Sequence, residues 1–203
     1  MKYHLGCGGN YFQGYINVDF PQSEHTIATV KADIYSSLLD LKYEPCEEIR
    51  SHHVFEHFNY VESFALLVKW TRALKMGGIL RIDLPDMEAL SLALAHAATD
   101  QNSLRIFRCM RMIYGSHEAE WAYHVTGWTQ TSLSYILEEL GYTLQECRKY
   151  GDPDSDFPNC GIDMSFIKIY DKDVKEIAKN LFSLYAVEPS LNRLFKDQLD
   201  KLC

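Results

Sequence analysis

The chain has 203 residues, of which 47% are apolar and 13% aromatic, and a formal net charge of −8 at pH 7. These values fit one domain with a sizeable core and argue against a disordered chain. The negative charge, with no lysine- or arginine-rich block to offset it, argues against nucleic acid as a partner because a phosphate backbone would be repelled. We therefore expect a single domain over residues 1–203 that acts on a small molecule.

The use of cysteine and the absence of targeting segments indicate a protein of the cell interior. No apolar run approaches the roughly 18 residues of a membrane span, and the N-terminus lacks the apolar region of a signal peptide. The six cysteines contain no Cys-x-x-Cys pair, which favours reduced, packed thiols over a disulfide framework or a zinc cluster. The expectation is a cytoplasmic protein with no membrane partner and no bound metal.

The N-terminal segment predicts a nucleoside site. A strand at 2–5 runs into Gly6-Cys7-Gly8-Gly9, and a second strand at 15–19 ends on Asp19. Glycines after a first parallel strand let the backbone approach a ligand, and a carboxylate after the next strand can accept both ribose hydroxyls. Asp19 follows the glycines far sooner than the roughly 20 residues of the dinucleotide fingerprint, which weakens the alternative of a nicotinamide-dependent oxidoreductase.

The middle of the chain continues as alternating strands and helices. Further strands are predicted at 28–33, 47–51 and 79–84. Apolar residues spaced three and four apart from Val61 to Val68 predict a helix over 60–75, which Gly77-Gly78 would end. This alternation is typical of a parallel sheet whose ligand edge lies at the C-terminal ends of its strands.

The second half predicts a lid, a final strand pair and terminal helices. Residues 87–123 are helical in character, and we expect them to form a lid on the acceptor side. A helix follows Thr131, and strands at 142–150 and 162–170 should pair antiparallel through a turn-rich surface loop. Helices at 173–183 and 190–202 would cover an edge of the sheet or a second copy of the chain in a homodimer.

Four ordered motifs carry a family resemblance: Leu5-Gly6-Cys7-Gly8, then Ile16-Asn17-Val18-Asp19, then 51–57, then 74–86. They resemble class I S-adenosylmethionine-dependent methyltransferases, in particular a small type 11-like group with the pattern LGCG, INVD, SHVLEH and LKPGG-x-LRI-x-x-PD. The resemblance implies an α/β fold: a Rossmann-like sheet, mostly parallel with an antiparallel last strand, and helices on both faces. It also implies S-adenosylmethionine as cofactor and S-adenosylhomocysteine as product.

The resemblance assigns the cofactor-binding residues by position. It places Leu5, Gly6, Cys7 and Gly8 near the methionine moiety and Asp19 on the ribose, and it places Asp33 and Ile34 near the adenine, with Ser51 and His52 at the end of the fourth strand. Only five residues separate Gly9 from Tyr15, so the helix that usually joins the first two strands must be about one turn long or absent.

His53 is the candidate general base. A neutral imidazole at the end of the fourth strand could remove the proton of an acceptor hydroxyl, and His124, before Thr126-Gly127-Trp128, is the second candidate. The same stretch spells H-x-x-E-H (His53, Glu56, His57), a zinc-peptidase pattern that needs both histidines on one face of a long helix. Zinc hydrolysis is therefore a remote alternative.

The acceptor side is predicted from charge. Asp86 matches the family pattern, and Arg105, Arg108 and Arg111 recur every three residues within the expected lid. Asp86 is predicted to line the acceptor pocket, and the arginines to bind an anionic acceptor, such as a sugar or its phosphate-bearing precursor in surface-polysaccharide biosynthesis. The alternative readings are a solvated helix face for the arginines and a non-catalytic, regulatory protein that binds the cofactor.

Overall fold

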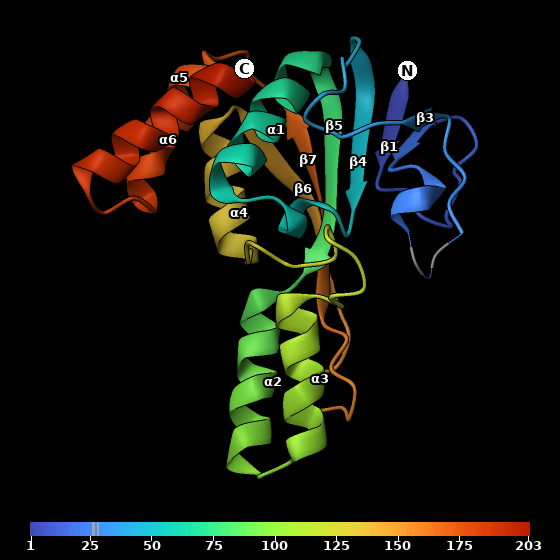
Figure 1. Ribbon diagram of the computed structural model, residues 1–203. Helices are drawn as coiled ribbons and strands as arrows, with labels where there is room; N and C mark the ends of the chain where they lie inside the picture. The colour runs from blue at the N-terminus through green and yellow to red at the C-terminus, as the bar shows by residue number, and fades with distance from the viewer. Residues whose placement is uncertain (26, 28) are drawn as a thin grey trace.

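The computed structural model describes residues 1–25, 27 and 29–203. They form a seven-stranded sheet of order β3-β2-β1-β4-β5-β7-β6 (Figure 1). The strands are β1 (Lys2–Leu5), β2 (Ile16–Asp19), β3 (Ile34–Tyr35), β4 (Cys46–His52), β5 (Leu74–Pro85), β6 (Tyr142–Tyr150) and β7 (Gly161–Lys168). Pairing is parallel from β3 to β5, and β7 runs antiparallel to both β5 and β6. The predicted Rossmann-like, mostly parallel sheet with an antiparallel last strand is confirmed.

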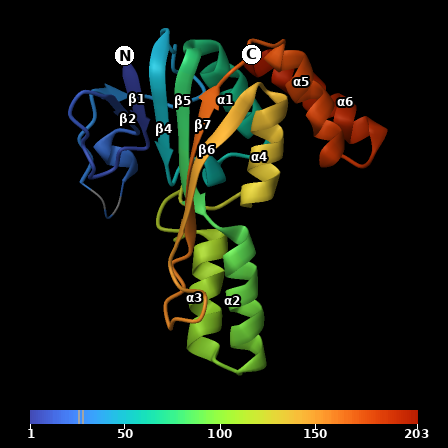
Figure 2. The same cartoon turned by 180° about the vertical axis from the view of Figure 1, so that it is seen from behind.

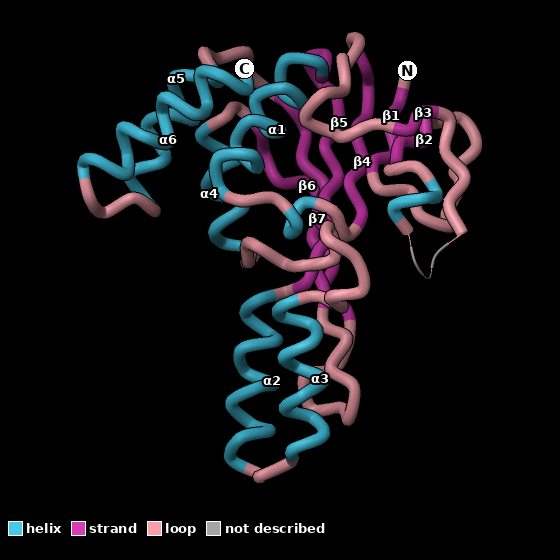
Figure 3. Tube along the Cα trace, viewed as in Figure 1, coloured by secondary structure: helices cyan, strands magenta, loops and turns pink. Residues whose placement is uncertain are grey.

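The α-helices of the described chain lie in two groups. They are α1 (Tyr60–Ala73), α2 (Met87–Thr99), α3 (Ser103–Tyr114), α4 (Gln130–Glu139), α5 (Val174–Leu181) and α6 (Pro189–Leu202), with short 3-10 helices η1 (Gln22–Glu24), η2 (Phe55–His57) and η3 (Phe182–Leu184). Helices α1 and α4 pack on the sheet, and α5 and α6 pack on α1 of their own chain. Helices α2 and α3 form a hairpin that projects from the edge where β5 ends (Figures 1 and 3). None of these helices is long and apolar enough to cross a membrane.

The two faces of the sheet differ in composition. Leu80, Ile82 and Leu84 of β5 are fully buried in one core with residues of α1 and α4. The side chains between them point the other way, where Arg81 pairs with Asp163 at 3.0 Å. Figure 2 shows this second face of β4 to β7 with no helix over it. Helices on both faces were expected, but those of the described residues leave this face bare because the links after β1, β2 and β3 hold only η1.

A short segment takes the place of the missing first helix. Phe12 lies in the link between β1 and β2 and stacks on His4 of β1, with ring centroids 4.2 Å apart. The backbone N–H of Phe12 donates to the Asn17 side chain, whose amide donates back to the Phe12 carbonyl. One turn of ordered chain therefore covers the β1 end of the second face.

Two predicted element boundaries are wrong. A strand was expected at 28–33, part of which lies outside the described residues, and the structure instead has the two-residue β3. The backbone N–H of Asn17, which a longer paired strand would use, donates to the Asp33 carboxylate. Helix α1 ends at Ala73, before the glycines, and β5 begins at once. The buried Lys168 ammonium ends the helix by donating to the carbonyls of Thr71 and Leu74, at 2.9 and 2.8 Å.

Candidate active site

A cavity of about 240 Å³ opens at the C-terminal ends of β1, β2 and β4. Its lining is mainly apolar, with a few polar groups, as is usual for a small-molecule site. The described lining residues are Gly6, Cys7, Gly8, Asn10, Asp19, Phe20, His25, Ser36, Leu38, His52, His53, Val54, His57, Phe58 and Trp121. The cavity lies where parallel α/β sheets bind their ligands.

The loop after β1 forms the floor of this cavity. Gly6 has φ +67°, and its N–H donates to the Val18 carbonyl at 2.9 Å. A Cβ on Gly6 would collide with the Val54 side chain. Gly8 also has a positive φ, but a Cβ there would meet open space. The first glycine therefore allows a close approach between the loop after β1 and Val54, which follows β4, and the second leaves backbone open to a ligand.

Asp19 is held in place by three donors. The Gly8 N–H donates to Oδ2 at 2.6 Å, and the Phe20 N–H donates to Oδ1 at 2.7 Å. His25 Nε2 lies 3.1 Å from Oδ1. The carboxylate is almost fully buried and retains lone pairs beyond these contacts. Asp19 thus connects the glycine loop to the wall of the cavity.

Four of the predicted cofactor residues lie outside the lining. Leu5 and Ser51 are completely buried within the sheet. Ile34 belongs to β3, and the Asp33 carboxylate accepts from the Asn17 backbone and from the Tyr11 hydroxyl at 2.8 and 2.7 Å. The structure brings together the remaining five, Gly6, Cys7, Gly8, Asp19 and His52.

Several lining residues were missed by the sequence reasoning. Phe20 directly follows Asp19 and could have been predicted from that position. Ser36 and Leu38 follow β3, and they were missed because this strand was predicted at 28–33. Trp121 lies in the segment that follows α3 in the chain, and its Nε1 donates to the Glu24 carbonyl at 2.6 Å. No local pattern marks such a contact, because it depends on how two distant loops meet.

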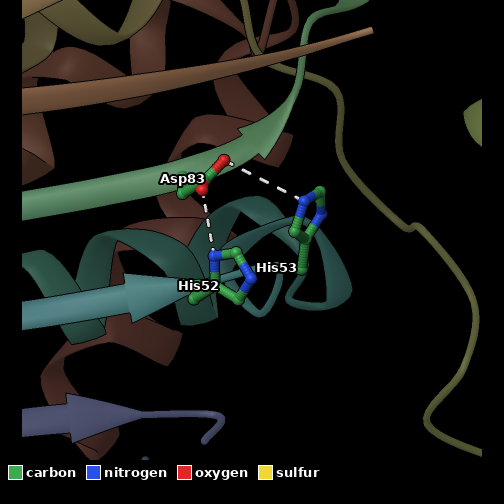
Figure 4. A group of neighbouring side chains, drawn as sticks. All are labelled: His52, His53 and Asp83. Carbon is green, nitrogen blue, oxygen red and sulfur yellow. Dashed lines mark hydrogen bonds and ion pairs between the residues drawn. The ribbon is translucent and has the colours of Figure 1, made fainter. Parts of the chain in front are cut away.

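His52 and Asp83 form a pair at the ends of β4 and β5 (Figure 4). His52 Nδ1 lies 2.9 Å from Asp83 Oδ2. Burial opposes ionisation of Asp83, but hydrogen bonds from His52 and Tyr150 lower the pKa of this carboxyl. An ionised carboxylate can only accept, so Nδ1 carries the proton. In the neutral ring Nε2 is then the lone-pair nitrogen, and it forms no hydrogen bond with the described residues.

His53 has a different hydrogen-bonding state. Its Nδ1 lies 3.2 Å from Glu56 Oε1, and its Nε2 lies 3.0 Å from the Tyr150 hydroxyl, which donates its own proton to Asp83 Oδ1. Both ring nitrogens therefore face acceptors and both must donate. Burial works against the charged ring, but the hydrogen bond to Glu56 and the charges of Glu56 and Asp83 raise the pKa of His53. The ring has no free lone pair in this arrangement.

A second cavity, of about 460 Å³, shares a wall with the first. The shared residues are His53, His57 and Trp121. The remaining described lining residues are Pro85, Arg111, Met112, Gly115, Ser116, Glu118, Ala122, His124, Phe157 and Asn159. Segment 115–124, within the predicted lid, covers the strand ends, whereas the α2–α3 hairpin projects away from them (Figure 3). The two cavities thus lie side by side.

Some of the predicted acceptor residues line the second cavity, and the others lie outside both cavities. Arg111 and His124 line the second cavity. Arg105 is buried and donates to the Pro153 carbonyl and, at 3.1 Å, to Asp154. Arg108 donates to the Asp156 carbonyl at 2.8 Å. These two arginines hold the loop between β6 and β7 against α3, outside both cavities.

Asp86 has a local role in this structure. Its Oδ1 accepts from the Glu88 N–H at 3.0 Å, so it is the N-cap of α2. Its Oδ2 lies 3.3 Å from the Lys149 ammonium. The carboxylate is buried in these contacts and does not line either cavity.

Comparison with solved structures identifies the fold. A candidate methyltransferase from Haloferax volcanii, in complex with the methyltransferase activator Trm112, matches with a TM-score of 0.52 and 13% identity over 84% of this chain and 82% of that one. A candidate methyltransferase from Bacillus halodurans matches with a TM-score of 0.52 and 11% identity over 83% and 92%.

A SAM-dependent methyltransferase from Methanosarcina mazei matches with a TM-score of 0.51 and 13% identity over 84% and 92% of the two chains. The chain has the class I methyltransferase fold. Neither a protein-family model nor a curated protein sequence matches it. The methyltransferase fold is thus shared at low identity, and the function must be argued from the site.

Proposed function

We propose that the protein transfers a methyl group from S-adenosylmethionine to an anionic small-molecule acceptor. The observation that carries the proposal is the first cavity, which combines an open glycine backbone, a buried carboxylate and an apolar wall at the ligand edge of a methyltransferase fold. The second cavity adjoins it through three shared residues. Two-substrate chemistry needs such neighbouring sites.

The chain's own residues fit the cofactor. Asp19 is fixed by Gly8 and Phe20, so its remaining lone pairs are available to ribose hydroxyls. The apolar side chains of Phe20 and Leu38 suit an adenine, and the open backbone at Gly8 suits a close-lying chain. Of the cofactor contacts expected from the sequence, we retain the five that line the cavity. When bound, S-adenosylmethionine supplies a methyl group that is already a good electrophile.

We assign the general base to His52 rather than to His53. Asp83 fixes the His52 tautomer, so that Nε2 can accept a proton as the acceptor oxygen forms its bond to the methyl carbon and the carbon–sulfur bond breaks. His53 has both nitrogens committed to donation. Its positive charge lies at the wall between the cavities, where it favours a negatively charged acceptor.

Arg111 supports the anionic character of that acceptor. Among the three arginines of α3 it is the one that lines a cavity, and no ion pair is formed by its guanidinium among the described residues. A guanidinium can bind phosphate or carboxylate through two parallel hydrogen bonds. A phosphate-bearing sugar precursor is one such acceptor, and the lining of the cavity also accommodates other anionic molecules.

The test is cofactor binding with a matched pair of carboxylate variants. Asp19→Ala should weaken binding of S-adenosylhomocysteine, measured by calorimetry, by about 1.5–3 kcal/mol, roughly 10- to 150-fold. Asp33→Ala, which removes a nearby carboxylate outside the cavity, should leave the affinity of the folded protein unchanged. Equal affinities of Asp19→Ala and the wild type, or binding of NAD in place of S-adenosylhomocysteine, would contradict the proposal.

A further inference from the structure

Three side chains at the wall between the cavities form a cluster that the methyl-transfer chemistry leaves unused. Glu56, His57 and His124 each offer a donor atom, and these atoms lie within 4.8 Å of one another. His124 Nε2 lies 3.9 Å from Glu56 Oε1. His57 lines both cavities and His124 lines the second. The cluster is therefore accessible from the space assigned to the acceptor.

Both histidines of this cluster are oriented by backbone carbonyls. His57 Nδ1 lies 2.9 Å from the Tyr123 carbonyl, and His124 Nδ1 lies 3.0 Å from the Met112 carbonyl. A carbonyl only accepts, so each Nδ1 carries a proton, and in the neutral ring each Nε2 presents a lone pair. Metal-binding histidines are held in this way, with the second nitrogen donating to a carbonyl or carboxylate.

The Glu56 carboxylate also indicates a cation site. Glu56 is only 2% exposed, and its Oε2 is buried with no hydrogen-bond partner among the described residues. The other oxygen, Oε1, lies 3.2 Å from His53 Nδ1. A buried carboxylate oxygen without a partner is costly unless a cation or donor meets it.

We propose that Glu56, His57 and His124 bind one divalent transition-metal ion, of the zinc type, at the wall between the two cavities. Two imidazoles and one carboxylate are the ligands of such ions, and three protein ligands leave a position open. Tetrahedral ligands lie roughly 3.3 Å apart, so the side chains need to close by about an ångström. The open position would face the second cavity, and, if the proposed function holds, it would take an oxygen atom of the acceptor.

The neighbouring group His52, His53 and Asp83 (Figure 4) is the less suitable metal site, although its donor atoms are equally close. Both Asp83 oxygens already accept hydrogen bonds, and both His53 nitrogens already donate. A metal ion there would displace four satisfied contacts. In the proposed site it would meet Glu56 Oε2 and the Nε2 atoms of His57 and His124, which form no hydrogen bond with the described residues.

The test is titration of the purified, metal-free full chain with Co²⁺, followed by visible absorption, and competition with Zn²⁺. We expect one ion per chain with a micromolar or tighter constant, in the absence of cofactor and acceptor. His57→Gln and His124→Gln should each weaken binding at least 100-fold, whereas His52→Gln and the distant His96→Gln should leave it unchanged. Because no methyl transfer is measured, this result is independent of the proposed function.

Three results would overturn the proposal: no Co²⁺ or Zn²⁺ bound at 100 µM, unchanged affinity in folded His57→Gln or His124→Gln, or loss of binding in His52→Gln. Thermal unfolding establishes whether each variant is folded. Should both ligand variants unfold, a Zn²⁺-soaked crystal of the wild type decides the question. Anomalous density between Glu56, His57 and His124 supports the site, and its absence there contradicts it.

Discussion

The two cavities that meet at His53, His57 and Trp121 are built in different ways. The first is formed by backbone turns at the ends of β1, β2 and β4, and its central contact is between the Gly8 N–H and Asp19. The second is formed by side chains of α3, of segment 115–124 and of the loop between β6 and β7. Under the proposed function, the geometry of the strand ends would position the cofactor, whereas loops and helix side chains would determine which acceptor binds.

The two neighbouring histidines that follow one another at the end of β4 give the largest expected effect. His52→Gln should lower the rate of methyl transfer by about 10²–10⁴, because it removes the proposed base while leaving the cavity's shape nearly intact. His53→Gln should lower the rate less. Production of S-adenosylhomocysteine with a pool of anionic metabolites measures both variants. A larger loss in His53→Gln would return the base to that residue.

The backbone of the first cavity can be tested with its two glycines. Gly6→Ala should lower the free energy of unfolding by about 3 kcal/mol, because the positive φ and the collision with Val54 add together. Gly8→Ala has the positive φ alone and should lose about 1 kcal/mol. Urea denaturation measures both values. Equal losses would mean that the close approach of the loop after β1 to Val54 is not what requires Gly6.

The side chains of the second cavity can be tested with two arginines of one helix. Arg111→Ala should raise the Michaelis constant for an anionic acceptor about tenfold, more at low salt, with little change for the cofactor. Arg108→Ala removes an equal charge outside the cavity and should leave both constants nearly unchanged. If the two variants behave alike, Arg111 contributes only to the overall electrostatic field of the protein and does not contact the acceptor.

The smallest effect concerns His4, which lies beneath the first cavity. Its Nδ1 bonds Asn17 Oδ1 at 3.1 Å, and burial lowers the pKa of this imidazole below its ordinary value near 6.5. The unfolded chain therefore binds the proton at higher pH than the folded chain, so stability falls as pH drops below about 6.5. His4→Gln should flatten this part of the stability profile, measured by thermal unfolding. Identical slopes in the two proteins would contradict the assignment.

The first cavity could be predicted from sequence in part. Gly6, Cys7, Gly8, Asp19 and His52 were expected in the site and line it, because each lies at the end of a strand or in the loop just after it, and an apolar run marks where the strand ends. Asp33 was expected near the adenine but lies outside the cavity, and the strand predicted at 28–33 was also wrong. The short β3 depends on a side-chain contact with Asn17, and such contacts leave no periodic signal.

The succession of strands along the chain, the glycine loop and the parallel pairing can be predicted from the sequence, because they follow from local backbone preference and apolar periodicity. The tertiary structure decided which histidine keeps a lone pair. His52, His53, His57 and His124 are the same residue type, and what distinguishes them is the partner of each ring nitrogen: Asp83, Glu56 and Tyr150, or a backbone carbonyl. Except for Glu56, three residues from His53, those partners come from distant parts of the chain, so only folding brings them within hydrogen-bond distance.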